Sequence, residues 1–162
     1  DTGGERPRGG LGESGLRSPG VFKGYWNKPE ATAKTLQHGW VHTGDMGRLD
    51  EAGYLCFVGR FKEMIKVSGY SVFPEEVEAM LIKHPSVAQA AVIGVPDATK
   101  GEVVKAVIVP KPEARGRVTA EEIIAWSREH MSTYKAPREV EFRDALPATG
   151  AGKLLRRLLK PQ

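Results

Sequence analysis

The sequence contains a single cysteine, Cys56, among its 162 residues. One cysteine can form neither an intramolecular disulfide nor the cysteine cluster of a zinc site. The four histidines have no metal-ligand spacing between them, and no serine lies in a G-x-S-x-G elbow, so neither metal binding nor serine hydrolysis has support. No apolar run is long enough to span a bilayer. We therefore expect a protein of a reducing compartment, with a cytoplasmic location and no metal site of its own.

The excess of basic over acidic residues is small. Lys and Arg number 24 against 20 Asp and Glu, which gives a formal net charge of +4. A balance of this size suits anionic small molecules but gives no argument for a nucleic-acid partner. The N-terminus, "DTGGERPRGG", begins without Met and has the pattern of neither a signal peptide nor a transit segment. We expect the sequence to be a piece of a longer protein.

The first 60 residues are rich in turn-forming residues and β-branched or aromatic stretches. Residues 1–20 have little periodicity and are expected as a loop or a poorly formed strand pair. A short helix is expected around residues 30–36. Residues 39–60, "GWVHTGDMGRLDEAGYLCFVGR", are expected to form strand, turn, strand, turn and strand, because glycines interrupt the apolar runs.

From Lys62 onward strands and helices alternate. The expected hairpin turns at Ser68-Gly69, and the capping box pairs Thr119 with Glu122 at the start of a helix. The other expected elements are a helix from residue 74 to 84, strands in 86–97, 101–111 and 137–147, and a final helix that carries Leu154, Leu155, Leu158 and Leu159. The fold class is α+β: a small C-terminal domain of mixed sheet and helices over 61–162, preceded by a β-rich remnant of a larger domain over 1–60.

The segment "ALPATGAGKLLRRLLK" places Lys153 behind two glycines. A phosphate-binding Walker loop is excluded, because Pro147 stands where the first glycine is needed and Leu154 where a hydroxyl is needed. Two interpretations stay open for the basic residues of this segment. They form either the solvated face of a packed helix or a nucleic-acid-binding tail. The residues concerned are Lys153, Arg156, Arg157 and Lys160.

Three further features also have two interpretations each. Asp45 in "HTGDMG" either accepts hydrogen bonds from vicinal ribose hydroxyls or caps a turn through its own backbone. The basic residues near the domain boundary either hold an anion or are solvated; they are Arg60, Lys62 and Lys66. His84 and His130 fall on apolar helix faces, where we expect hydrogen-bonded core histidines.

Together, "GYWNKPEATAKTL", "HTGDMGRLDEAGYLCFVGR", "KVSGYSVFPEEVE", "YKAPREVEF" and "ALPATGAGK" resemble the C-terminal third of an AMP-forming acyl-CoA synthetase. This superfamily includes beetle luciferases and the adenylation domains of peptide synthetases. The resemblance covers Gly20 to Leu159 and implies a two-step ligase. A carboxylic acid, for which a fatty acid is one candidate, reacts with ATP in the presence of Mg²⁺ to give an acyl-adenylate, which coenzyme A then attacks.

The resemblance also implies roles for individual residues. Asp45 would hold the AMP ribose hydroxyls, with Arg60 as a second nucleotide contact. Lys62 would be the hinge about which the small domain rotates between the two half-reactions. Lys153 would reach the acid carboxylate and the phosphate during adenylation. The face used in the second half-reaction, against coenzyme A, would include Lys66, Ser68, Gly69 and Tyr70.

The sequence departs from the family in places. The strand expected after "GE" reads "GESGLRSP", a basic residue is replaced by Ala148, and Ser71 stands where relatives often have a longer polar side chain. No segment matches the ATP phosphate loop or the acid pocket of the missing N-terminal region, so most of the ATP and Mg²⁺ contacts are expected there. We expect the isolated chain to be inactive. The alternative hypothesis is a stand-alone nucleotide-binding or interaction module without catalysis.

Overall fold

The computed structural model of the chain describes residues 4–160. The chain divides into two compact units, Asp1–Lys62 and Glu63–Gln162. The sequence predicts the boundary between residues 60 and 61, and residues 1–3 and 161–162 of the two predicted domains lie outside the described part. Within residues 4–160, no helix combines the length and the apolar character needed to cross a membrane.

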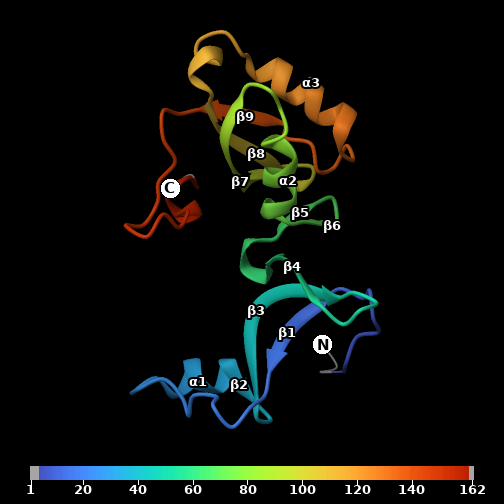
Figure 1. Cartoon of the computed structure of the whole chain (residues 1–162), viewed down its shortest axis with the longest axis vertical. Coiled ribbons are helices and arrows are strands. Elements are labelled where there is room, and N and C mark those ends of the chain that lie inside the picture. The colour runs from blue at the N-terminus through green and yellow to red at the C-terminus, as the bar shows by residue number, and fades with distance from the viewer. Residues whose placement is uncertain (1–3, 161–162) are drawn as a thin grey trace. The chain divides into compact units, whose positions relative to one another are not determined.

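The first unit is built around one long strand, β3 (Figure 1). It pairs antiparallel with each of the other three strands. The elements of this unit are β1 (Gly12–Leu16), α1 (Pro29–Thr35), β2 (Leu36–Gln37), β3 (Trp40–Leu49) and β4 (Leu55–Arg60). Strand β1 lies in the segment expected as a loop or a poorly formed strand pair. Its partner β3 is distant in sequence, which local composition does not indicate.

The turn predicted inside residues 40–49 is wrong, because β3 continues through it. Gly44 adopts a φ of +73°, in the left-handed region that glycine tolerates without strain. The register shifts between Glu13 and Gly15 on one side of β3 and between Met46 and Gly47 on the other. The glycines therefore bend the strand at bulges and do not end it.

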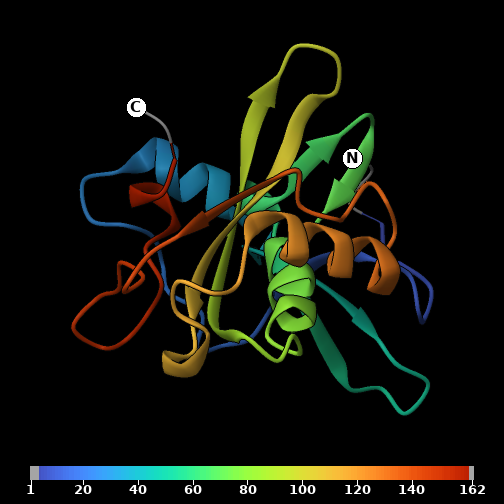
Figure 2. The ribbon, with the colours of Figure 1, turned by 90° about the horizontal axis from the view of Figure 1, so that it is seen from above.

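The second unit is a five-stranded sheet with helices, which is the predicted α+β class (Figures 1 and 2). The strand order is β6-β5-β8-β7, and β9 joins β8 in parallel. Its elements are η1 (Phe61–Glu63, crossing the unit boundary), β5 (Ile65–Val67), β6 (Tyr70–Val72), α2 (Pro74–Leu81), β7 (Val87–Asp97), β8 (Gly101–Pro110), η2 (Pro112–Ala114), α3 (Ala120–His130), β9 (Glu139–Phe142) and η3 (Arg156–Leu158).

Both faces of the β7–β8 pair are covered. Alternate strand residues point to opposite faces, so Val92 packs with Leu81 of α2 and Ile123 of α3, whereas Ile93 packs with Leu159 of the C-terminal segment. Figure 1 shows α2 and α3 on one side of these strands and the C-terminal segment on the other. This explains why both strands are nearly continuous apolar runs.

The helix boundaries follow from local chemistry. Pro74 occupies the first helical position of α2. At the start of α3, the Thr119 hydroxyl accepts a hydrogen bond from the backbone N–H of Glu122, whose carboxylate accepts one from the N–H of Thr119, as predicted. The core position predicted for His130 is wrong. Its exposed ring stacks on Trp126 at a centroid distance of 4.0 Å.

The final helix predicted over the leucines is also wrong. Only Arg156–Leu158 forms a helical turn, of the 3₁₀ type. Leu154 pairs with Ala148 in an isolated β-bridge, and the N–H of Leu155 donates to the carbonyl of Pro147 at 2.8 Å. These contacts take the backbone groups that a helix would need. A segment this short does not form a helix by itself, so tertiary contacts decide its conformation.

Candidate functional site

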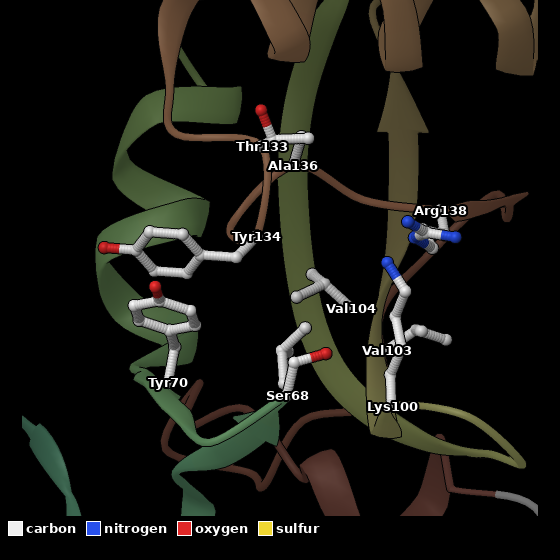
Figure 3. Close-up of a pocket in the computed structure, with 10 residues that line it drawn as sticks. Ser68, Tyr70, Lys100, Val103, Val104, Thr133, Tyr134, Ala136 and Arg138 are labelled. Carbon is white, nitrogen blue, oxygen red and sulfur yellow. The ribbon is translucent and has the colours of Figure 1, made fainter.

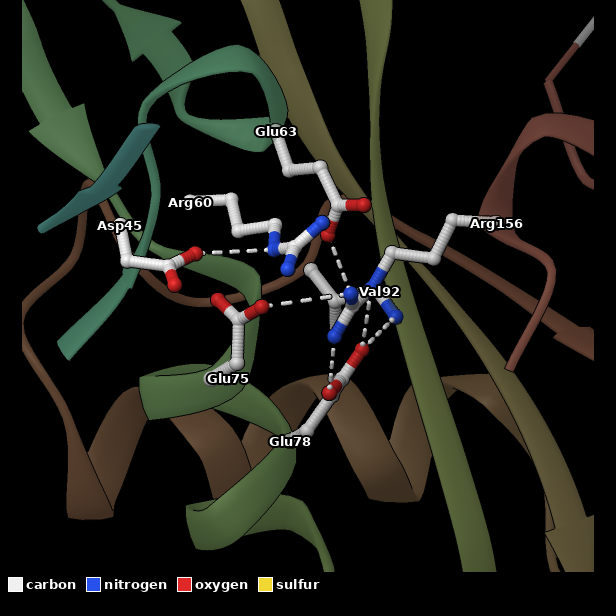
Figure 4. Close-up of polar contacts among 7 residues, drawn as sticks. All are labelled: Asp45, Arg60, Glu63, Glu75, Glu78, Val92 and Arg156. Atoms are coloured by element: carbon white, nitrogen blue, oxygen red, sulfur yellow. Dashed lines mark hydrogen bonds and ion pairs between the residues drawn. The ribbon is translucent and has the colours of Figure 1, made fainter. Parts of the chain in front are cut away.

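Asp45 and Arg60 face each other in the first unit, on neighbouring strands β3 and β4. Oδ1 of Asp45 lies 3.0 Å from Nε of Arg60, in an ion pair that Figure 4 shows. The side chains are 33% and 49% exposed, respectively. The register of the antiparallel pair therefore brings together a carboxylate and a guanidinium that are 15 residues apart in sequence. Both side chains are partly exposed, but Oδ1 of Asp45 itself is buried and accepts no hydrogen bond within residues 4–160.

The backbone around Asp45 is held by other side chains. The N–H of Gly44 donates to the carboxylate of Glu13 at 2.8 Å, and the N–H of Asp45 donates to the hydroxyl of Thr43 at 3.1 Å. The second oxygen of Glu13 lies 2.8 Å from Nδ1 of His42. The backbone groups at this turn are therefore capped by Glu13 and Thr43 and not by the side chain of Asp45, which was one of its two interpretations. The carboxylate of Asp45 contacts Arg60 instead.

The hairpin of β5 and β6 presents the residues predicted for the second half-reaction. Ser68 and Gly69 have φ values of +49° and +87°, which is the pattern of a two-residue type I′ turn. Nζ of Lys66 donates to the Ser71 hydroxyl across the hairpin at 2.8 Å. The N–H of Lys66 donates to the carboxylate of Glu102 in β8, at 2.7 Å. Ser71 and Glu102, to which the sequence assigned no role, therefore hold Lys66 in place.

A cleft of about 260 Å³ lies beside this hairpin, within the second unit (Figure 3). Tyr70 stacks on Tyr134 at a centroid distance of 4.5 Å and an interplanar angle of 17°. Figure 3 shows these rings on one side of the cleft and the basic groups of Lys100 and Arg138 on the other. Ser68 also lines the cleft, and its N–H donates to the carbonyl of Lys100 at 2.9 Å.

The two cations of the cleft make no salt bridge with any group in residues 4–160. The carboxylate of Asp97 accepts hydrogen bonds from Thr99 and from the backbone N–H of Lys100. These hydrogen bonds hold the pKa of Asp97 below its usual range, and the charge of Arg138 acts in the same direction. Unpaired cations next to aromatic rings can bind a ligand that combines phosphate groups with a flat ring system.

Lys153 lies at the end of a tight loop and is exposed. Its N–H donates to the Thr149 hydroxyl at 3.1 Å, and its carbonyl accepts from the N–H of Thr149 at 2.8 Å. Gly152 has a φ of +78°, and the bridge of Ala148 with Leu154 closes the loop. The loop is therefore internally ordered, with the lysine side chain in solvent.

The basic residues after Lys153 differ from one another in environment. Arg157 and Lys160 are exposed, as predicted, but Arg156 is 15% exposed and forms ion pairs with Glu63, Glu75 and Glu78. The prediction of a solvated face is wrong for Arg156, because three carboxylates from elsewhere in the unit surround it. In the folded chain the charge of Arg156 is therefore already paired and is not available to bind a nucleic acid.

Among residues 4–160, no group of three His, Cys, Asp or Glu side chains is arranged to hold a metal ion.

A comparison with protein families matches residues 76–153 to the model of the AMP-binding enzyme C-terminal domain. Residues 76–153 of the chain therefore belong to this family. The match includes the cleft residues Lys100, Tyr134 and Arg138, and it ends at Lys153. The resemblance inferred from the sequence is thereby confirmed at the level of the family.

The relatives of this AMP-binding enzyme C-terminal domain are much longer. A long-chain-fatty-acid–CoA ligase of Escherichia coli is 42% identical over 162 residues, which is all of this chain and 28% of that protein. A feruloyl-CoA synthase of Amycolatopsis is 47% identical over 150 residues, or 93% of this chain and 30% of that protein. The crystal structure of ATP-bound MatB from Rhodopseudomonas palustris matches with a TM-score of 0.91 and 36% identity, over 98% of this chain and 31% of that one. The chain spans less than a third of the length of each.

The structure groups only some of the predicted site residues. Asp45 contacts Arg60 in the first unit, and Lys66 shares one hairpin with Ser68, Gly69 and Tyr70 in the second. Lys153 lies on a separate loop of the second unit, and Lys62 ends the first. Sequence reasoning missed the cleft residues Lys100, Tyr134 and Arg138, although the segment "YKAPR" gave a signal, a tyrosine closely followed by two basic residues.

Proposed function

We propose that this chain is the C-terminal part of an AMP-forming acyl-CoA synthetase. In the first half-reaction a carboxylate oxygen of the acid attacks the α-phosphorus of ATP and pyrophosphate leaves. In the second, the thiol of coenzyme A attacks the acyl carbonyl carbon and AMP leaves. The observation that carries this proposal is that one small unit of the family's fold bears both a lysine-tipped loop and an aromatic, cationic cleft.

For the first half-reaction the proposed group is Lys153. An ammonium group about 4 Å from developing negative charge, at an effective dielectric constant near 20, contributes roughly 4 kcal/mol. The loop exposes this side chain on an ordered backbone, which supports a role at a phosphate bound by another part of the protein. Asp45 is proposed to accept the ribose hydroxyls, and Arg60 to orient that carboxylate and contact the nucleotide.

For the second half-reaction we propose that the cleft holds the nucleotide end of coenzyme A. Lys100 and Arg138 supply positive charge for its phosphates, and the stacked Tyr70 and Tyr134 supply a flat surface for its adenine. The hairpin residue Ser68 lies at the same cleft and is proposed to face the pantetheine chain.

The two proposed faces belong to different half-reactions, so we propose that the small unit rotates about Lys62 between them. ATP, Mg²⁺ and the acid would be bound mainly by the N-terminal part of the full-length protein, and the isolated chain would be inactive. The relatives named above point to a fatty acid or an aromatic acid such as ferulate as the substrate. The cytoplasmic location stays a prediction from the sequence.

The test uses the full-length protein that carries this sequence. Acid-dependent exchange of pyrophosphate into ATP is measured with a panel of acetate, laurate, palmitate and ferulate. Lys153→Ala is expected to lower this exchange by roughly 100- to 1,000-fold, while thioester formation from supplied acyl-adenylate and coenzyme A changes little. Lys160→Ala, which removes an exposed lysine outside the loop, is the matched control and should retain full exchange.

Equal loss of both half-reactions in Lys153→Ala would contradict the role of Lys153. Absence of exchange with every acid, together with retained nucleotide binding, would favour the stand-alone binding module instead.

The cleft is tested separately through Arg138. Arg138→Gln should raise KM for coenzyme A by about threefold to tenfold, the range expected for one partly exposed charged contact. Pyrophosphate exchange should stay unchanged. Arg128→Gln, at an exposed position of α3, is the control. An unchanged KM in Arg138→Gln would argue against coenzyme A in this cleft.

A further inference from the structure

Arg156 is held by three carboxylates in the second unit (Figure 4). Its Nε and Nη2 donate to the two oxygens of Glu78 at 3.1 and 2.7 Å, and its Nη1 contacts Glu63 and lies 3.2 Å from Glu75. All three guanidinium nitrogens are therefore engaged. We call this set of four side chains the Arg156 clamp.

The clamp joins elements that are far apart in sequence. Glu75 and Glu78 belong to α2, and Glu78 also accepts a hydrogen bond from the N–H of Val92 in β7, at 2.8 Å. Glu63 is the residue directly after Lys62, the proposed hinge. The C-terminal segment is thereby tied both to the rigid core of the unit and to its first residue.

The electrostatics favour a permanently charged arginine at this place. Burial alone would lower the pKa of Arg156, but the hydrogen bonds to Glu78 and the charges of Glu78, Glu75 and Glu63 outweigh it and raise the pKa above its usual value. A lysine could not reproduce the contacts, because its single ammonium lacks the planar fork that binds both oxygens of one carboxylate.

Arg156, the central residue of the clamp, lies three residues after Lys153 in the sequence. The loop before it is closed by the bridge of Ala148 with Leu154, and Leu154 and Leu159 pack on the sheet face opposite α2 and α3. These contacts hold the segment against the sheet. The clamp adds a fixed connection from the same segment to α2 and to Glu63, so it restricts the position of the loop in a second direction.

We propose that Arg156 is a positioning residue for Lys153, and that its clamp keeps the lysine loop in fixed register with Glu63 next to the hinge. The inference rests on the proposed function and deepens it, since a lysine that acts only in one domain orientation must arrive at the phosphate in a defined place whenever the small unit rotates. A displacement of about 1 Å at a catalytic group can lower a rate by as much as roughly 100-fold.

The experiment uses the full-length protein with Arg156→Gln, which loses the charge, and Arg156→Lys, which keeps the charge but loses the fork. Arg157→Gln and Arg157→Lys, at the exposed neighbour, are matched controls. Both half-reactions are measured as above, with the acid that is active in the panel. Amide hydrogen exchange of residues 149–155 and of β7 and β8 is measured on the same proteins without substrates.

For Arg156→Gln, kcat of adenylation is expected to fall on the order of 10- to 100-fold. KM for ATP and the rate of thioester formation from supplied acyl-adenylate should change less than about threefold, because the clamp does not bind those substrates. Residues 149–155 should exchange faster while β7 and β8 stay protected. Arg156→Lys should lower kcat of adenylation less, with the same pattern of amide exchange. If Arg156→Gln does not fold, Arg156→Lys alone tests the proposal.

The inference is overturned by unchanged exchange of residues 149–155 in both Arg156 variants, by parallel loss of both half-reactions, or by equal effects in the Arg157 controls. Failure of the proposed function has a different result: the wild-type protein then shows no acid-dependent pyrophosphate exchange. In that case hydrogen exchange, which needs no substrate, still supports or refutes the fixed loop.

Discussion

Glu75 and Glu78 lie one turn apart on α2 and both contact Arg156, yet we expect only the replacement of Glu78 by glutamine to lower the stability at pH 7. Glu78 binds the guanidinium through both oxygens, accepts the N–H of Val92 and is 13% exposed. Glu75 makes one contact with Arg156, at 3.2 Å, and its Oε2 is buried without a hydrogen-bond partner in the described residues. Replacing Glu78 therefore removes a carboxylate whose hydrogen bonds are all made, whereas replacing Glu75 removes one with an unpaired buried oxygen.

For Glu78→Gln the amide oxygen can replace only part of the fork. Charge-assisted hydrogen bonds contribute roughly 1.5–3 kcal/mol each, and Glu63 and Glu75 still neutralise Arg156, so we expect a loss of about 1–3 kcal/mol in the free energy of unfolding. For a unit of this size, 1 kcal/mol corresponds to about 4–8 °C in Tm.

For Glu75→Gln the sign follows from the pKa. Burial raises the pKa of Glu75 above its ordinary value of 4.5, against the opposing effects of its backbone hydrogen bond and of Arg156. A carboxyl with a raised folded-state pKa contributes stability at low pH and loses that contribution as pH rises through the folded pKa. Glutamine does not titrate, so at pH 7 Glu75→Gln should be as stable as the wild type or more stable.

The assay is urea unfolding of the 162-residue chain, followed by circular dichroism at 222 nm, at pH values from 4 to 8. The stability of Glu75→Gln relative to the wild type should rise as pH increases above about 4.5, whereas Glu78→Gln should be less stable at pH 7. Equal destabilisation by both variants at pH 7, or a pH-independent difference for Glu75→Gln, would refute the reasoning.

Three other substitutions test the fold by the same unfolding assay. Thr119→Ala removes the capping box of α3 and should cost about 1 kcal/mol; no change would mean that α3 does not depend on its cap. Leu159→Ala removes a side chain that is 5% exposed and should cost about 2–4 kcal/mol; a cost below that range would show that the C-terminal segment packs loosely on the sheet. Gly69→Ala places a Cβ at a φ of +87° and should cost about 1–2 kcal/mol. Ser68→Gly, at a φ of +49°, should not lower the stability. A larger loss of stability for Ser68→Gly than for Gly69→Ala would contradict the type I′ turn.

Sequence motifs predict part of the candidate site, and the roles of these residues stay predictions. Asp45, Lys66 and Lys153 were chosen from motifs, and the glycine-rich spacing correctly indicated a tight turn at Ser68-Gly69. The cleft was not predicted, because Tyr70, Lys100 and Arg138 come from three separate segments that only the sheet brings together. The predicted solvated position of Arg156 is wrong for the same reason, since helical spacing among leucines indicates nothing about carboxylates more than 70 residues away.

By itself the sequence determined the family, the α+β class and most local elements of this protein. These depend on short-range chemistry: the capping box at Thr119, the proline at the start of α2, and the apolar runs of β7 and β8. Tertiary structure alone decided which strand pairs with β1, that β3 continues through Gly44, and that Arg156 is enclosed while Arg157 is not. The physical reason is that strand pairing and burial of charge depend on distant partners, whose backbone and carboxylate groups outweigh the local preferences of a short segment.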